Sequence, residues 1–147
     1  MLLRPTNPDA SWRPVSGRCI GPMLEGFRCS GGLVAGDALA EMLRRHCDQP
    51  ISYLARRIAR GELVHVSWRS EILVPLFQFD RSDMSLRHGV RQVIETLAPA
   101  YDSWEIATWF AEPSVWLRGH RPANVMDPDP TAVMEAARVD WFLTAGL

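Results

Sequence analysis

The C-terminal stretch WEIATWFAEPSVWLRGHRPANVMDPDPTAVMEAARVDWF, residues 104–142, decides the fold of this chain. Apolar residues recur at helical spacing in two runs, and a segment rich in proline and glycine separates them. We therefore expect one helix over 104–111 and another over 131–144. The second helix has the clearer start, because Asp129 is followed by Pro130, and proline suits the first position of a helix.

Upstream of this stretch the hydrophobic period changes. Residues 86–97 carry apolar side chains at helical spacing, which predicts a third C-terminal helix. Before it, residues 63–79 place β-branched and aromatic side chains on both sides of a polar turn at 69–71. This pattern predicts a β-hairpin. Pro75 lacks a backbone N–H, so it should end the second strand early or confine it to an edge.

Two helices are predicted before the hairpin. The first covers 37–47, where Asp37 is a suitable N-cap for an apolar stripe. The second covers 51–60 and stops at Gly61.

Residues 1–32 have no such period. Their prolines and glycines indicate an irregular arm. Met23, Leu24 and Phe27 are placed to hold part of this arm against the body of the protein.

Composition narrows the function classes. The chain has 147 residues, of which 47% are apolar and 22% charged, as expected for one globular domain. Its net charge of −1 creates no global attraction to nucleic acid or to an anionic membrane. Three cysteines without C-x-x-C spacing do not indicate a disulfide framework. The start lacks an apolar signal core, and no apolar stretch approaches 18 residues, so we expect a cytoplasmic protein.

No catalytic, metal or cofactor pattern emerges. The four histidines have neither mutual nor cysteine spacing typical of zinc. There is no G-x-S-x-G elbow, phosphate-binding loop or dinucleotide fingerprint. Asp127 and Asp129 are better explained as helix caps than as paired catalytic carboxylates, because prolines follow both. We therefore expect a protein that is not an enzyme and has no cofactor and no metal.

Basic residues gather around the second helix and the hairpin, at Arg56, Arg57, Arg60 and Arg69. A short helix pair followed by a hairpin is the outline of a winged helix-turn-helix, whose second helix enters the major groove. Arginines on its outer face would meet phosphates or guanine edges. An ordinary solvent-exposed helix face has the same composition. The slight negative net charge of the chain favours this explanation over DNA contact.

Tryptophan is concentrated near the C-terminus: four of the six lie in the last 44 residues, at Trp104, Trp109, Trp116 and Trp141. Aromatic side chains dominate both cores and interfaces. Four exceed what a small three-helix core readily hides, so we expect at least one on a contact surface. The apolar terminus WFLTAGL should also be covered by something.

The segment from Ser103 to Gly146 resembles the C-terminal toxin-binding domain of Xre/MbcA/ParS-type antitoxins. The resemblance rests on the order of a helix ending in an aromatic residue, a proline, a bulky pair before glycine, a further proline and an alanine-rich last helix. The hairpin end LVPLFQFD looks like the stretch that leads into this domain, so the resemblance covers about 110 residues. It implies binding to a cognate toxin, commonly a RES-domain enzyme that consumes NAD.

Carried over to this chain, the resemblance implies a toxin-binding surface around the connector and the end of the last helix. Its residues would be Pro113, Trp116, Leu117, Gly119, Pro122, Trp141, Phe142, Leu143, Gly146 and Leu147. The N-terminal half departs from the family, because it has no clear Xre-type helix-turn-helix. A DNA-binding regulator and a stand-alone adaptor or homodimer of the same fold are the alternatives.

The expected fold is therefore mainly α (α+β), with a helix pair and a small hairpin followed by a three-helix toxin-binding domain. We expect three regions: an irregular arm (1–32), degenerate helix-turn-helix-like helices with the hairpin (33–80) and the helical domain (81–147).

Overall fold

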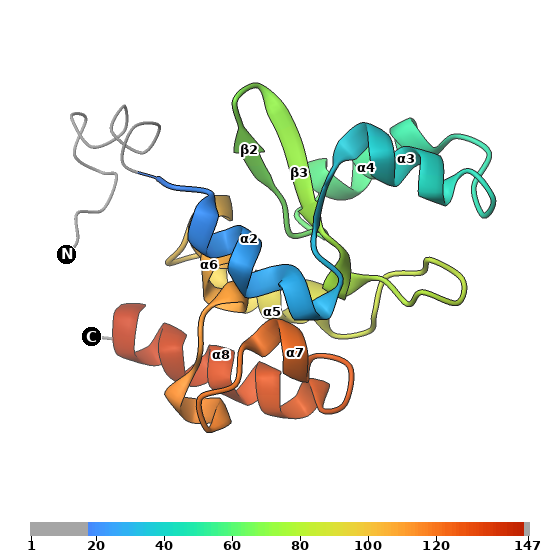
Figure 1. The fold of residues 1–147 in the computed structure, drawn as a ribbon. Helices are drawn as coiled ribbons and strands as arrows, with labels where there is room; N and C mark the ends of the chain where they lie inside the picture. The colour runs from blue at the N-terminus through green and yellow to red at the C-terminus, as the bar shows by residue number, and fades with distance from the viewer. Residues whose placement is uncertain (1–17, 146–147) are drawn as a thin grey trace.

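A computed structural model describes residues 18–145 of the chain, and within this range the fold is mainly helical with one small antiparallel sheet (Figure 1). The predicted α+β class is confirmed at this level. The α-helices are α2 (Gly21–Phe27), α3 (Gly36–Leu43), α4 (Pro50–Ala59), α5 (Val90–Leu97), α6 (Ser103–Ala111), α7 (Pro122–Val125) and α8 (Pro130–Ala145). The strands are β1 (Leu33–Ala35), β2 (Val66–Trp68) and β3 (Glu71–Pro75), and the 3-10 turns are η1 (Arg28–Ser30), η2 (Leu76–Gln78) and η3 (Val115–Leu117).

The helices α6 and α8 begin at residues suited to the start of a helix. Asp102 and Glu105 form a capping box at the start of α6, each side chain accepting the other's backbone N–H at 2.8–2.9 Å. Pro130 is the first residue of α8. The prediction of three helices was incomplete, because the connector folds into η3 and the short helix α7. α5 begins four residues later than expected, since Leu86 instead bridges to Phe79.

The sheet has the order β1-β3-β2, so β3 is its central strand. The β2–β3 turn is tight, with both Arg69 (φ 50°) and Ser70 (φ 66°) in the left-handed region that suits hairpin turns. The expectation that Pro75 confines β3 to an edge was wrong, and the expectation that it ends the strand is confirmed. β1 was not predicted, because three residues are too short to show a period.

The prediction of an irregular arm was wrong for its second half. Residues 21–27 form α2, with Pro22 in its first turn, and Met23 and Phe27 are buried while Leu24 is exposed. Phe27 stacks on Phe77 with ring centroids 5.8 Å apart, which supplies the burial that makes this short helix stable. Residues 1–17 of the expected arm lie outside the described part.

The core consists of two hydrophobic clusters. The larger one joins α2, α5, α6, α7 and α8, which Figure 1 shows packed in the lower half of the molecule. The smaller one lies between α3, α4, β3 and η2. Gln78 lies at their junction, fully buried, where its amide bonds to both the N–H and the carbonyl of Val64 at 2.8 Å and to the carbonyl of Pro75 at 3.0 Å. A polar side chain is tolerated there because each of its bonding groups has a partner.

Gly26 sets the closest approach between α2 and α6. A Cβ at this position would clash with the carbonyl oxygen of Ala111 and lie 2.7 Å from the Ala111 Cβ. We predict that G26A lowers the free energy of unfolding by roughly 1–3 kcal/mol, because overpacking outweighs the helix propensity gained. Urea denaturation measures this change. The matched variant G21A lies in the same helix with only Cys19 Sγ nearby, at 3.7 Å, and should be neutral or stabilising. Equal stability of the two variants would contradict the close packing.

Candidate partner-binding surface

Large apolar side chains are exposed around η3 and the end of α8. We call this set, Val115, Trp116, Val139, Phe142 and Leu143, the C-terminal patch. Residues 139, 142 and 143 follow the i, i+3, i+4 spacing, so their side chains share one side of α8. Phe142 is 58% exposed and Trp116 47%, whereas side chains of this size normally contribute most of their surface to a core.

Trp116 is held in place although half of its surface is exposed. Its indole Nε1 donates to Asp140 Oδ1 at 2.7 Å, and the Nε1 of Trp109 donates to the other oxygen of the same carboxylate at 2.6 Å. The Ser114 hydroxyl accepts the backbone N–H of Trp116 at 3.2 Å. One carboxylate on α8 therefore fixes a tryptophan from α6 and one from η3. This arrangement fixes the orientation of the half-exposed Trp116 ring.

Some of the residues implied by the resemblance come together on this surface and others do not. Trp116, Phe142 and Leu143 belong to the patch, and Pro113 and Gly119 are exposed in the loop around η3.

Leu117 and Pro122 are buried, so the expectation that they form part of the surface was wrong: both pack inward beneath the loop. Trp141 is half-buried, and its indole N–H has no hydrogen-bond partner among the described residues. Gly146 and Leu147 lie outside the described residues.

Sequence reasoning missed Val115 and Val139. Both have ordinary side chains for a core, and Val139 is distinguished only by its helical spacing from Phe142 and Leu143. The helical spacing of these residues could be recognised in the sequence. Which side of α8 faces solvent, however, depends on where α5 and η3 pack.

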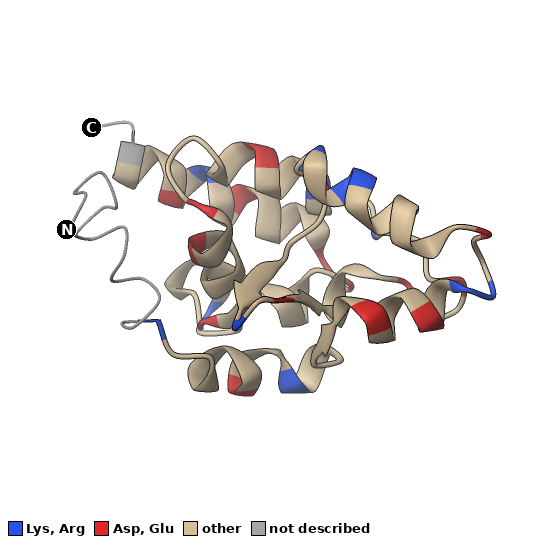
Figure 2. Ribbon diagram, turned by 90° about the horizontal axis from the view of Figure 1, so that it is seen from above, with Lys and Arg blue, Asp and Glu red and all other residues tan. Residues whose placement is uncertain are grey.

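The four arginines considered for DNA contact have different roles. Arg57 Nη1 pairs with Glu62 at 2.8 Å and its guanidinium lies over the Tyr53 ring, so it stabilises the fold. Arg69 lies over Trp68 with its guanidinium 5.2 Å from the ring centroid. Arg56 and Arg60 remain exposed on α4. Figure 2 shows acidic and basic residues interspersed along the ribbon rather than one extended basic stripe.

No protein-family model, curated protein or solved structure matches this chain. Between residues 18 and 145, no three His, Cys, Asp or Glu side chains are grouped as a metal site would require. In the same range, no helix has the length and hydropathy needed to cross a membrane.

Glu62 makes the stability of the folded protein depend on pH. Its side chain is 8% exposed and pairs with Arg57 and, at 3.5 Å, with Arg91. The hydrogen bond from Arg57 lowers the pKa of Glu62 below its ordinary value of 4.5, and the nearby arginine charges add to this effect while burial opposes it. Because the folded-state pKa is the lower one, the stabilisation is present above the unfolded pKa and is lost as pH falls through the folded value.

We therefore predict that wild type is more stable than E62Q at pH 7, and that the two stability curves converge between roughly pH 5 and 3. Chemical denaturation at each pH measures the difference. E95Q removes the other carboxylate that pairs with Arg91, an exposed one, and its curve should run parallel to that of wild type. A constant difference between wild type and E62Q down to the lowest pH would refute the role given to Glu62.

Proposed function

We propose that this chain is an antitoxin-like protein that binds and neutralises a cognate toxin through the C-terminal patch. The observation that carries the proposal is the exposure of large apolar side chains on η3 and at the end of α8, with the ring of Trp116 fixed by Asp140. Large apolar side chains that are exposed near one end of a globular protein are typical of a site that another macromolecule covers.

The chemistry of the patch favours a protein partner. Tryptophan is enriched among the residues that contribute most to binding between proteins. The Asp140 carboxylate already accepts two indole N–H groups, so both of its oxygens have a hydrogen-bond partner before any binding partner arrives. Trp116 also needs little further ordering on binding, which lowers the entropic cost of association.

The reason for proposing a toxin as the partner is the resemblance of residues 103–146 to antitoxin toxin-binding domains. Three of the surface residues that the resemblance implies, Trp116, Phe142 and Leu143, are also members of the patch. This agreement supports a toxin as the occupant, with a RES-domain enzyme as the expected kind. A second copy of the chain is the competing occupant.

The test is co-expression with the product of the neighbouring gene. We expect a stable complex and rescue of growth by wild type, and loss of both by F142S and W116A, each weakening binding by about ten-fold or more, as for interface hot spots. I51S is the matched control, because Ile51 is 69% exposed but lies on α4, away from the patch. It should bind as wild type does.

Three results would count against this proposal: no complex, equal rescue by all variants, or equal loss in I51S. Light scattering on the isolated protein tests whether a second copy of the chain occupies the patch instead of a toxin. A homodimer that F142S converts to monomer would assign the patch to self-association.

DNA binding is the second candidate, and the element order supports it. β1, α3, α4 and the β2–β3 hairpin follow one another with β1 beside β3, the order of a winged helix-turn-helix. In that arrangement α4 would be the recognition helix, and it carries the exposed Arg56 and Arg60.

If these arginines contact phosphates, binding to duplex DNA should weaken with salt, and R56A/R60A should reduce the slope of log K against log salt by about two. Fluorescence anisotropy measures the slope. R118A/R138A removes the same charge from two exposed sites, one directly after η3 and one on α8, and should leave the slope unchanged. Equal effects of the two double variants would reduce DNA binding to a net-charge effect.

A further inference from the structure

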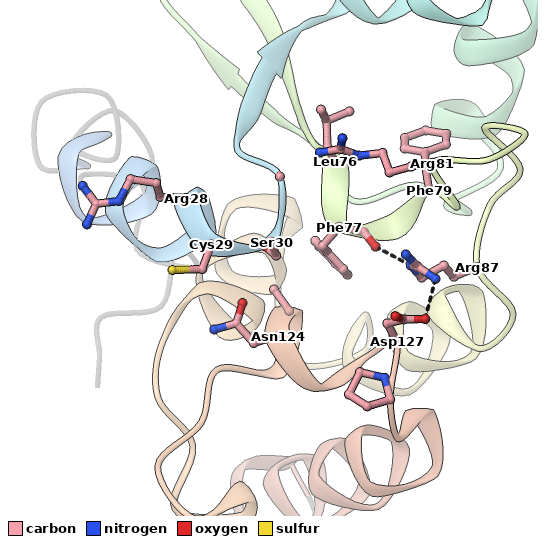
Figure 3. Close-up of a pocket in the computed structure, with 13 residues that line it drawn as sticks. Arg28, Cys29, Ser30, Leu76, Phe77, Phe79, Arg81, Arg87, Asn124 and Asp127 are labelled. Atoms are coloured by element: carbon pink, nitrogen blue, oxygen red, sulfur yellow. Dashed lines mark hydrogen bonds and ion pairs between the residues drawn. The ribbon is translucent and has the colours of Figure 1, made fainter.

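A cleft of about 530 Å³ lies between three segments that are distant in sequence: residues 28–31, 76–87 and 123–128 (Figure 3). It is separate from the C-terminal patch, none of whose members line it. Its lining contains three arginines and one aspartate, together with Ser30 and Asn124. In Figure 3 Arg28 points away from the cleft, so Arg81 and Arg87 are the two lining arginines available to a ligand there.

Arg87 is fixed at one wall. Its Nε donates to the Phe77 carbonyl at 3.0 Å, and its Nη1 donates to Asp127 Oδ1 at 2.7 Å. Figure 3 shows the guanidinium held between these two acceptors. A guanidinium has five N–H donors, and these two bonds use only part of them. The Arg87 side chain is 23% exposed, so it remains accessible to a ligand.

The Arg81 guanidinium lies against Gly31. A Cβ at Gly31 would lie 2.7 Å from Arg81 Nη2, and the backbone there has φ +122°, which L side chains rarely adopt. Among the described residues Arg81 has no ion-pair partner.

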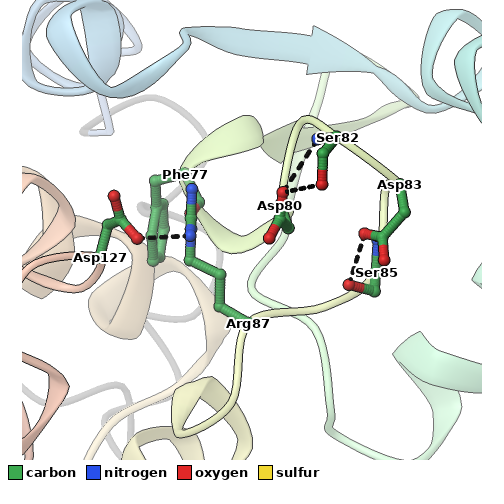
Figure 4. A network of polar contacts seen from close by, with 7 residues as sticks. All are labelled: Phe77, Asp80, Ser82, Asp83, Ser85, Arg87 and Asp127. Carbon is green, nitrogen blue, oxygen red and sulfur yellow. Dashed lines mark hydrogen bonds and ion pairs between the residues drawn. The ribbon is translucent and has the colours of Figure 1, made fainter.

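The acidic residues of the same loop already accept hydrogen bonds from neighbouring serines. Asp80 accepts from the backbone and hydroxyl of Ser82, and Asp83 does the same with Ser85 (Figure 4). These bonds lower the pKa of both aspartates, with the hydroxyl of Ser82 foremost for Asp80 and the backbone N–H of Ser85 foremost for Asp83. Both carboxylates therefore stay ionised, and neither neutralises Arg81 by direct pairing.

We propose that this cleft binds the phosphate group of a small ligand, with Arg81 as the principal cation and Arg87 as a further donor. Guanidinium groups match the geometry of phosphate oxygens, and such charge-assisted bonds are about twice as strong as neutral ones. The cleft is larger than a phosphate alone needs and is within the size range of small-molecule sites. Leu76 and Phe77 also line the cleft, with 5% and 4% of their surfaces exposed. The proposal is independent of toxin binding.

Isothermal titration calorimetry on the full chain tests this proposal, with phenyl phosphate, inorganic phosphate and phenol as probes. We expect saturable one-to-one binding of phosphate-bearing probes and none of phenol. Tighter binding of phenyl phosphate would identify a phosphomonoester as the ligand class, and equal binding would identify free phosphate. R81Q should weaken binding by about ten-fold, because it removes a charge-assisted contact. R45Q, an exposed arginine outside the cleft, should leave binding unchanged.

Absence of saturable binding at millimolar phosphate, binding of phenol as tight as that of phenyl phosphate, or equal losses in R81Q and R45Q would overturn the proposal. Circular dichroism checks that R81Q is folded. If it is not, R81K decides the question. Lysine keeps the charge but not the forked contact, so several-fold weaker binding supports the site and unchanged binding overturns it.

Discussion

The fold depends on the burial of Phe77 between two other phenylalanines. Phe27 stacks on one side of it and Phe110 lies 4.7 Å from it between centroids, so α2, η2 and α6 meet at one ring. The next residue, Gln78, satisfies the backbone of Val64 and thereby ties the segment before β2 to the same point. Apolar contact and buried hydrogen bonding thus act on adjacent residues. Together they join the sheet and the two hydrophobic clusters into one body.

This central packing has a consequence for the surface. α8 is covered by α5, α7 and η3, which bury Val133, Ala136 and Ala137 and leave the opposite side of the helix in solvent. Asp140 lies at the boundary, where it draws Trp109 and Trp116 toward α8. A single carboxylate therefore couples the interior to the C-terminal patch. The apolar area beyond it is not used by the described part of the chain, and this is why a binding partner is the function that we propose.

Several features were predictable because their causes are local. The caps of α6 and α8, the turn of the hairpin and the end of β3 at Pro75 each depend on a few neighbouring residues. The missed elements have a different character. β1 is three residues long and exists because β3 pairs with it, and α2 is stabilised by Phe77, a residue fifty positions away. In both cases short segments gain order from partners that no local pattern identifies.

The same distinction between local and tertiary causes applies to the candidate site. The sequence by itself determined that the C-terminal stretch is helical, because helical spacing is a local property. From composition alone it predicted that at least one of the four tryptophans lies on a contact surface. Only the tertiary structure decided that Leu117 and Pro122 face inward while Trp116, Val139 and Phe142 face outward. It also brought Arg81 and Arg87 to one cleft with Asn124. The physical reason is that exposure and cleft geometry are set by which elements pack together, and packing involves contacts between residues far apart in the chain.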